Sequence, residues 1–171
     1  MTIEHIKIRK MQEDDIPAVQ AFLFSQLQSL FNQERGQGAI TDDVWGLKEI
    51  YVLPPRHQLW LAYNELDQAV VGTIAISQYN DRISLLKGRY KLEQTAEIGR
   101  CYIEPELRCK GIGSCLLAEA EEFCRQHNYH IIYLHTHHFL PGGFHFWRKK
   151  NFAITIDEGG DNQIVHMEKS L

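Results

Sequence analysis

One segment near the middle of the chain limits the fold strongly, because it joins a strand pattern to a helix pattern through a glycine loop. Residues 96–103 have the apolar, β-prone character of a strand, and residues 104–107 form a proline-containing turn. Residues 115–124 then place apolar side chains at helical spacing. The loop between them is Arg108-Cys109-Lys110-Gly111-Ile112-Gly113-Ser114. This strand, loop and helix predict the first part of a β-α-β unit in an α/β domain.

The glycine loop is suited to binding an anion. Gly111 and Gly113 allow the backbone to approach a ligand closely. The first N–H groups of the following helix have no partner within the helix, so a phosphate can accept hydrogen bonds from them. Arg108 and Lys110 add positive charge beside these groups. The loop therefore predicts a pyrophosphate site and a nucleotide-like cofactor, although two glycines alone are also compatible with a simple tight turn.

Two common nucleotide-binding motifs do not fit this loop. A dinucleotide-binding fingerprint has a third glycine further into the helix, where this chain has Leu116. A Walker loop requires a Gly-Lys-Ser/Thr sequence after a four-residue spacer, which is missing here. A different class of nucleotide-like cofactor is therefore expected.

Length and composition favour an ordinary globular protein. The 171 residues, 44% of them hydrophobic, are expected to form one domain over residues 1–171 with a substantial core. The net charge of −4 argues against a nucleic-acid partner. We expect no membrane partner, because no apolar run is long enough to span a bilayer and the N-terminus has no apolar signal core. The four cysteines form no C-x-x-C pair, which favours reduced thiols and a cytoplasmic location.

The rest of the chain supplies further elements of an α/β domain. Helices are expected at about residues 14–31, 41–51 and 144–150, with a glycine-containing break at residues 34–39. Strands are expected at residues 3–9, 58–63, 69–78, 131–136, 152–157 and 163–168. Residues 80–95 are polar and are expected to form a surface loop or an extended hairpin. Gly72 lies inside an expected strand and predicts a bulge or a close backbone approach.

These residues and this order of elements resemble the GCN5-related N-acetyltransferase (GNAT) superfamily. Its acetyl-CoA signature, Arg/Gln-x-x-Gly-x-Gly/Ala, is matched at every fixed position by residues 108–113. The flanking Ala-Glu-Ile and Ile-Glu-Pro-Glu-Leu-Arg segments are also similar, as is the helix-to-strand segment at residues 144–152. The resemblance implies a mixed, mostly antiparallel sheet of about seven strands. It further implies a central parallel β-α-β splay and about four flanking helices.

The resemblance also implies an activity, the transfer of an acetyl group from acetyl-CoA to a primary amine by direct attack in a ternary complex. Acetyl-CoA would be the cosubstrate, and no metal is expected. A small-molecule amine is favoured because no appended peptide-binding module is expected, and a homodimer is compatible with the superfamily. The alternatives are a protein amino group as acceptor and a non-catalytic acyl-CoA-binding domain. The implied cofactor contacts are Tyr102, Ile103, Arg108, Cys109, Lys110, Gly111, Ile112, Gly113, Ser114 and Trp147.

The proton path is less clearly marked in the sequence. Glu97 lies on the strand before the glycine loop and is the candidate general base, while the alternative is a charged residue that borders a sheet edge. Many superfamily members have a tyrosine where this chain has Trp147, and an indole N–H is not a practical proton donor. Trp147 would then pack or steer the thioester, and Tyr102 or Tyr133 could supply a hydroxyl instead.

Histidines are concentrated near the end of the strand expected at residues 131–136. Their spacing matches no standard zinc pattern, which favours histidines that line a cleft or are exposed over a metal site. His138 is the candidate base or acceptor ligand among them, because it directly follows this strand. The resemblance implies that the segment at about residues 31–45 helps to form the acceptor pocket. The four histidines are His135, His137, His138 and His145.

Overall fold

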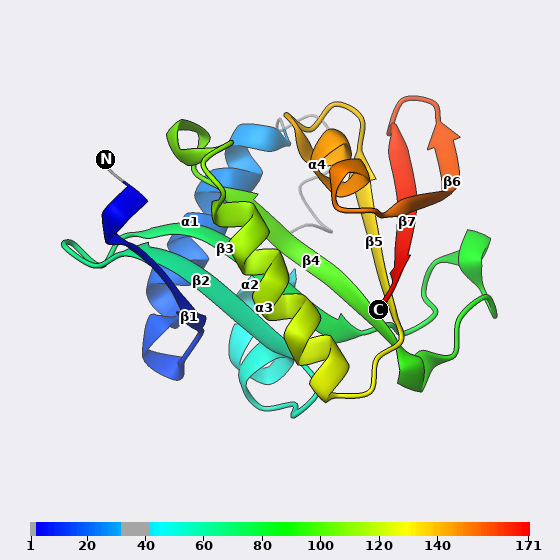
Figure 1. Ribbon diagram of the computed structural model, residues 1–171, viewed down its shortest axis with the longest axis horizontal. Coiled ribbons are helices and arrows are strands. Elements are labelled where there is room, and N and C mark those ends of the chain that lie inside the picture. Colours follow the sequence, from blue (N-terminus) through cyan, green and yellow to red (C-terminus); the bar gives the residue numbers. More distant parts are fainter. Residues whose placement is uncertain (1–2, 32–41) are drawn as a thin grey trace. The chain divides into compact units, whose positions relative to one another are not determined.

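A computed structural model describes residues 3–31 and 42–171 of the chain. Its strands form one seven-stranded sheet in the order β1-β2-β3-β4-β5-β7-β6 (Figure 1). β4 and β5 are parallel, whereas the β1–β2, β2–β3, β5–β7 and β6–β7 pairs are antiparallel. The predicted mixed sheet with a parallel pair is therefore confirmed. The strands are β1 (Ile6–Lys10), β2 (Gln58–Asn64), β3 (Val70–Gln78), β4 (Thr95–Ile103), β5 (Ile131–His137), β6 (Ala153–Gly159) and β7 (Ile164–Ser170).

Four α-helices lie between these strands in the described residues. They are α1 (Ile16–Leu30), α2 (Asp42–Trp45), α3 (Ile112–Gln126) and α4 (Gly143–Lys149). α3 connects the parallel strands β4 and β5, as the β-α-β pattern predicts. A single helix was expected over residues 41–51, but the structure has the short α2 followed by a π-helix at Lys48–Val52. The expected break at residues 34–39 lies outside the described residues, as does most of the segment implied to form the acceptor pocket.

The chain divides into two compact units. The first consists of Met1–Ser77 and Gly99–Glu122, and the second of Gln78–Ile98 and Phe123–Leu171. The division falls within β4 and within α3, so both elements contribute residues to each unit. The expectation of one domain over residues 1–171 stays a prediction.

The first unit has its core between α1, α2 and the strands β2 and β3. α1 begins at Ile16, with Pro17 in its first turn, where the missing N–H costs no helical hydrogen bond. Its buried residues recur at helical spacing and pack with side chains from β2 and the π-helix. The buried cluster comprises Met11, Val19, Phe22, Leu23, Leu27, Val44, Leu47, Tyr51, Leu59, Leu61 and Ala75.

Gly72 of β3 lies both at a bulge and at a close backbone approach, the two features that its position in a strand predicts. A β-bulge interrupts the β2–β3 register between Ala62 and Tyr63, beside Gly72. A Cβ atom on Gly72 would lie 2.8 Å from Cδ1 of Ile103 and 3.2 Å from the backbone oxygen of Tyr102. Only glycine fits this close approach of β3 to the end of β4.

The second unit has an aromatic core on β5 and the segment that follows β3. Tyr79, Tyr90 and Tyr133 are buried together, and the Tyr79 ring lies edge-on to the other two at centroid distances of 5.2 and 5.0 Å. Most residues of the segment 80–94 are exposed and none forms a strand, so the expected surface loop is confirmed and the alternative of an extended hairpin is wrong. This segment instead contains 3-10 helices at Ser84–Leu86 and Leu92–Gln94, because Leu86 and Tyr90 are buried in this core and hold it against β5.

The first strand begins later than the alternation of its residues suggests. Residues Ile3–His5 form a 3-10 turn, and β1 starts at Ile6. The other strands and α3 and α4 lie within about three residues of their expected bounds, an error typical of element ends. No helix in the described residues is both long and apolar enough to cross a membrane.

Candidate active site

The glycine loop (residues 108–114) leaves the first unit's part of β4 and turns sharply into α3. Cys109 and Gly111 have left-handed backbone conformations, with φ values of 59° and 92°. Leu107 and Ile112 are buried on either side, at 3% and 4% exposure, while the residues between Arg108 and Ile112 are exposed. The buried pair fixes the two ends of the loop, and its exposed centre presents backbone groups at the N-terminus of α3.

Hydrogen bonds stabilise both sides of this loop. The Arg108 side chain donates from Nε to the backbone oxygen of Ile103, at 3.1 Å. The amides of Ser114 and Cys115 both donate to the backbone oxygen of Gly111, at 2.9 and 3.1 Å. The turn is thus held by its own backbone and by one arginine. This geometry suits a pyrophosphate, whose oxygens accept hydrogen bonds at a helix N-terminus.

The part of β4 before the loop contains a strained residue. Arg100 has a φ of 50°, in the left-handed region that side chains other than glycine rarely adopt. Its backbone oxygen accepts a hydrogen bond from the Thr73 hydroxyl at 2.7 Å, and its guanidinium forms a two-contact ion pair with Asp43 of α2. These contacts offset a strain of about 1–3 kcal/mol. The pair ties α2 to β4 within the first unit.

The residues at the end of β4 that are implied to contact the cofactor are half-buried. Tyr102 packs against the core of the first unit, and Ile103 lies against Gly72. Burial raises the pKa of Tyr102, which makes its hydroxyl a poor proton donor. Burial also raises the pKa of Cys101 to about 12, so this thiol remains protonated and does not behave as a nucleophile.

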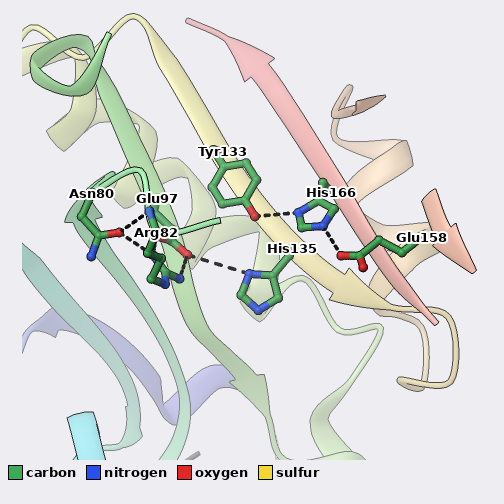
Figure 2. A network of polar contacts seen from close by, with 7 residues as sticks. All are labelled: Asn80, Arg82, Glu97, Tyr133, His135, Glu158 and His166. Carbon is green, nitrogen blue, oxygen red and sulfur yellow. Dashed lines mark hydrogen bonds and ion pairs between the residues drawn. The ribbon is translucent and has the colours of Figure 1, made fainter. Parts of the chain in front are cut away.

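The second unit's part of β4 carries Glu97 in a two-contact ion pair. Glu97 is buried, with 8% of its side chain exposed, and its carboxylate oxygens accept hydrogen bonds from Nη1 and Nη2 of Arg82, each at 2.5 Å. Asn80 supports Arg82 through its Oδ1 atom, at 3.1 Å from Nη1 (Figure 2). The pairing explains how a carboxylate can be buried in a sheet. The reading of Glu97 as a residue at a sheet edge is wrong, because β4 lies between β3 and β5.

A second polar chain crosses β5, β7 and β6. The Tyr133 hydroxyl lies 2.8 Å from Nδ1 of His166, and Nε2 of His166 lies 2.6 Å from a carboxylate oxygen of Glu158 (Figure 2). Burial raises the pKa of Tyr133, so its hydroxyl keeps its proton at neutral pH. The Tyr133 hydroxyl and both ring nitrogens of His166 thus have partners within the second unit.

His135 lies beside both groups of residues. Its Nδ1 atom is 3.8 Å from Oε1 of Glu97, which is an ion-pair distance but too long for a hydrogen bond (Figure 2). The surrounding protein lowers the pKa of His135 to about 4, mainly by burial, although 38% of its side chain is exposed. His135 is therefore neutral at pH 7. We call Glu97, Tyr133, His135 and His166 the polar face, since paired positions on β4, β5 and β7 carry them.

The other histidines near the end of β5 have separate partners. Nε2 of His138 lies 2.9 Å from Asp157, and Nδ1 of His137 lies 2.7 Å from the backbone oxygen of Asn162. His145 packs edge-on against Phe144. Within residues 3–31 and 42–171, no group of three or more His, Cys, Asp or Glu side chains is placed to hold a metal ion.

Trp147 is a packing residue in α4. It is 6% exposed and lies edge-on to Phe146 and Phe152, at centroid distances of 4.8 and 5.2 Å. These contacts anchor α4 to the start of β6. An indole in this environment offers one N–H donor and no acidic proton.

The structure therefore brings together one predicted catalytic residue, Glu97, with groups that the sequence did not mark. No recognisable motif contains Arg82, His166 or Glu158, and the three residues lie in separate segments of the chain. His135 was visible in the sequence as one of four histidines near the end of a strand, but nothing there singled it out. His138, the other predicted catalytic residue, pairs with Asp157 instead.

The parallel β4–α3–β5 connection and the glycine loop define a cofactor-binding α/β protein. Residues 24–152 match the model of the Acetyltransferase (GNAT) family. This match covers most of the chain, which therefore belongs to the GNAT family of acetyltransferases.

Solved structures share the fold over almost the whole chain. A GNAT-family acetyltransferase from Staphylococcus aureus has a TM-score of 0.77 and 19% identity, covering 97% of this chain and 99% of its own. PaiA N-acetyltransferase from Thermoplasma acidophilum, in complex with coenzyme A, has a TM-score of 0.70 and 22% identity over the full length of both chains. YncA from Salmonella typhimurium, a putative acetyltransferase with its cofactor acetyl-CoA, has a TM-score of 0.71 and 15% identity, covering 98% and 95%.

The fold is shared with 537 chains of solved structures, so it does not by itself identify the substrate of this chain. Among curated protein sequences, the comparison found no relative. The particular acceptor must therefore be argued from the residues of this chain.

Proposed function

We propose that this chain is an N-acetyltransferase that transfers the acetyl group of acetyl-CoA to the primary amine of a small molecule. The observation that carries the proposal is the glycine loop, with left-handed Cys109 and Gly111 turning exposed backbone into the N-terminus of α3. Family membership supports the acetyl transfer. The coenzyme A and acetyl-CoA in the PaiA and YncA structures support the choice of donor.

The proposed donor contacts follow from this geometry. Backbone amides of the loop would hold the pyrophosphate, with the charges of Arg108 and Lys110 beside them. Backbone groups of Tyr102 and Ile103 would hold the pantetheine arm. Trp147 would pack against the thioester or steer it, without donating a proton. The complete set of proposed donor contacts is Tyr102, Ile103, Arg108, Cys109, Lys110, Gly111, Ile112, Gly113, Ser114 and Trp147.

The chemistry requires that an ammonium group lose a proton before or during attack on the thioester. We propose that Glu97 takes part in this proton transfer, with His138 as a second candidate. Arg82 donates to both oxygens of Glu97, so an amine would have to approach the lone pairs that this ion pair leaves unused.

A small amine is the favoured acceptor because the polar face offers few groups for recognition. Glu97, Tyr133 and His166 are buried, which leaves His135 and the neighbouring, half-exposed Arg82 as the accessible polar groups. These suffice to position a compact amine. The free thiols of Cys101, Cys109 and Cys115 support a reducing, cytoplasmic location.

A non-catalytic acyl-CoA-binding domain is the alternative, and one observation favours it. Trp147 is buried among aromatic rings where many superfamily members have a tyrosine that protonates the leaving thiolate. Such a domain would bind CoA through the same loop but would not release free thiol.

A thiol-release assay with acetyl-CoA tests the proposal. The acceptor panel comprises polyamines, amino acids, aminoglycosides and lysine peptides, with CoA binding measured in parallel by calorimetry. We expect thiol release with a small amine and little with peptides. CoA binding without thiol release for any acceptor would support the binding domain, while preferred turnover of peptides would support a protein acceptor. Light scattering on the same preparation tests whether the chain forms a homodimer.

A further inference from the structure

Glu104 is a half-buried carboxylate of the first unit, between β4 and the glycine loop. It directly follows Ile103, the last residue of β4, and its amide donates to the backbone oxygen of Val71 at 2.9 Å. The 3-10 turn Pro105–Leu107 leads on to the loop, and its Leu107 amide donates to the backbone oxygen of Glu104 at 2.9 Å. These two hydrogen bonds fix Glu104 within the first unit, next to the proposed donor contact Ile103.

The carboxylate of Glu104 is held by one neutral side chain. Nε2 of Gln26 donates to Oε1 of Glu104 at 3.3 Å. Gln26 is 3% exposed and lies among the buried residues of α1, where its amide requires a hydrogen-bond partner. Within residues 3–31 and 42–171, Oε2 of Glu104 accepts no hydrogen bond, and this atom is not enclosed by the protein. One oxygen of the carboxylate is therefore fixed, and the other is open to a ligand.

The common structural roles of such a carboxylate do not apply to Glu104. Its side chain does not cap the 3-10 turn that follows it. The half-buried Asp15 and Asp43 of the same unit are each paired with an arginine, whereas Glu104 forms no ion pair with any described residue. The arginine of the glycine loop, Arg108, instead donates from Nε to the backbone oxygen of Ile103. Glu104 thus places a negative charge beside the loop without a counterion from the described residues.

This charge indicates the class of ligand that Glu104 can bind. A carboxylate repels the phosphates of a donor, so its complement is a cation. A metal ion fits poorly, because Mg²⁺ and Ca²⁺ take about six or more oxygen ligands, and no group of three His, Cys, Asp or Glu side chains in the described ranges is placed to hold one. An ammonium group, in contrast, forms a charge-assisted hydrogen bond with a single carboxylate. Glu104 is therefore suited to an organic ammonium ligand.

We propose that Glu104 binds an ammonium group of the acceptor that does not react, which makes the substrate a diamine or a longer polyamine. The inference rests on the proposed function and names its substrate class. The reacting nitrogen forms a bond to the acetyl carbon, and the carbon–sulfur bond breaks with its electron pair going to the CoA sulfur. Of the two protons that this nitrogen gives up, one ends on the sulfur and the other in water. The second nitrogen keeps its charge and donates a hydrogen bond to Oε2 of Glu104.

Two acceptors that differ in one ammonium group, putrescine and n-butylamine, test this assignment. We expect the wild type to acetylate putrescine with a kcat/KM at least about 10-fold higher than that for n-butylamine. Glu104→Gln should raise KM for putrescine by about 10- to 100-fold with little change in kcat, as expected for the loss of a hydrogen bond between charged groups. The same variant should keep the wild-type constants for n-butylamine and the wild-type CoA affinity, measured by calorimetry.

Glu106→Gln is the matched control. Glu106 is an exposed carboxylate in the 3-10 turn that follows Glu104, so its substitution removes the same charge from the same segment. We expect this variant to keep the preference for putrescine. In Glu104→Gln the new amide oxygen can still accept the hydrogen bond from Gln26, so the contact with α1 and the fold are retained.

The outcomes separate this inference from the function on which it rests. CoA binding without acetylation of any amine overturns both. Acetylation of putrescine and n-butylamine by the wild type with similar kcat/KM overturns only the assignment of a diamine. An unchanged preference in Glu104→Gln, the same loss in Glu106→Gln, or equal losses for the two amines overturn the role of Glu104, because its charge would then not act on a second ammonium group.

Discussion

The glycine loop and the polar face are held in shape in two different ways. The loop depends on backbone conformation, since two left-handed residues and a helix N-terminus set its shape. The polar face depends on side chains, since Glu97 is held by Arg82 and His166 by Tyr133 and Glu158. A backbone site is therefore sensitive to conformation, whereas a side-chain site is sensitive to the loss of a single partner.

The largest effect is expected when Arg82 is removed from the polar face. Arg82→Ala leaves the buried Glu97 carboxylate without its ion-pair partner. Breaking a buried pair in this way costs about 3–5 kcal/mol, and we expect the lower end because Arg82 itself is 45% exposed. Urea unfolding at pH 7 measures the loss of stability.

Arg89→Ala is the matched control for this prediction. Arg89 pairs with Glu168 at 3.2 Å, but both side chains are more accessible, at 47% and 28% exposure, and Tyr90 also donates to Glu168. Its removal should cost no more than about 1 kcal/mol. In addition, combining Glu97→Gln with Arg82→Ala should restore part of the lost free energy of unfolding, because the buried side chain is then uncharged. Equal effects of the two arginine substitutions would show that Glu97 is not held by Arg82.

A smaller effect, on binding, is expected from Gly111→Ala in the loop. The φ of Gly111 is 92°, and a Cβ there meets no atom within 4 Å, so the substitution acts through backbone strain alone. A strain of about 1–3 kcal/mol that distorts the loop should weaken CoA binding by about 10- to 100-fold in calorimetry. Gly88→Ala imposes similar strain at a φ of 74° in open space, outside the loop. Similar losses of CoA affinity in both variants would contradict a specific role for the loop.

The same contrast explains what could be predicted from the sequence. The loop is formed by consecutive residues, so its glycines, its charges and the flanking strand and helix were all visible together, and its place between β4 and α3 is confirmed. The sheet was predictable because alternating and buried apolar runs mark strands directly. The segment after β3 was predicted as a surface loop, but its polar composition gave no sign that Leu86 and Tyr90 are buried in the aromatic core.

The polar face could be predicted only in part. Glu97 was identified from its strand, but its partner Arg82 is 15 residues earlier in a segment without a pattern. His166 and Glu158 lie on the last two strands, and only the β5–β7–β6 order brings them to Tyr133. Partners of this kind depend on strand register, which spacing along the chain does not reveal. The roles of Glu97, His138 and the loop residues in catalysis and binding stay predictions.

The smallest effect is expected in the pH dependence of stability, and it concerns His135. Its pKa is lowered from 6.5 to about 4 in the folded chain, chiefly by burial. Between these values the unfolded chain binds a proton that the folded chain does not, so this residue makes stability fall as the pH falls from 6.5 towards 4. His135→Gln removes the effect. Between pH 7 and pH 5 the free energy of unfolding should fall further in the wild type than in the variant. Because 38% of the side chain is exposed, we expect this difference to be less than about 1 kcal/mol.

Urea unfolding of the wild type and the variant at pH 7, 6 and 5 measures this difference. Asp15, whose pKa is lowered by its hydrogen bonds with Arg9 against the effect of burial, loses its contribution at lower pH, and it does so equally in both proteins. Gly111→Ala changes no titratable group and should keep the wild-type slope even where it has lost CoA affinity. Parallel slopes for wild type and His135→Gln would mean that His135 is already protonated at pH 6, as an exposed imidazole is.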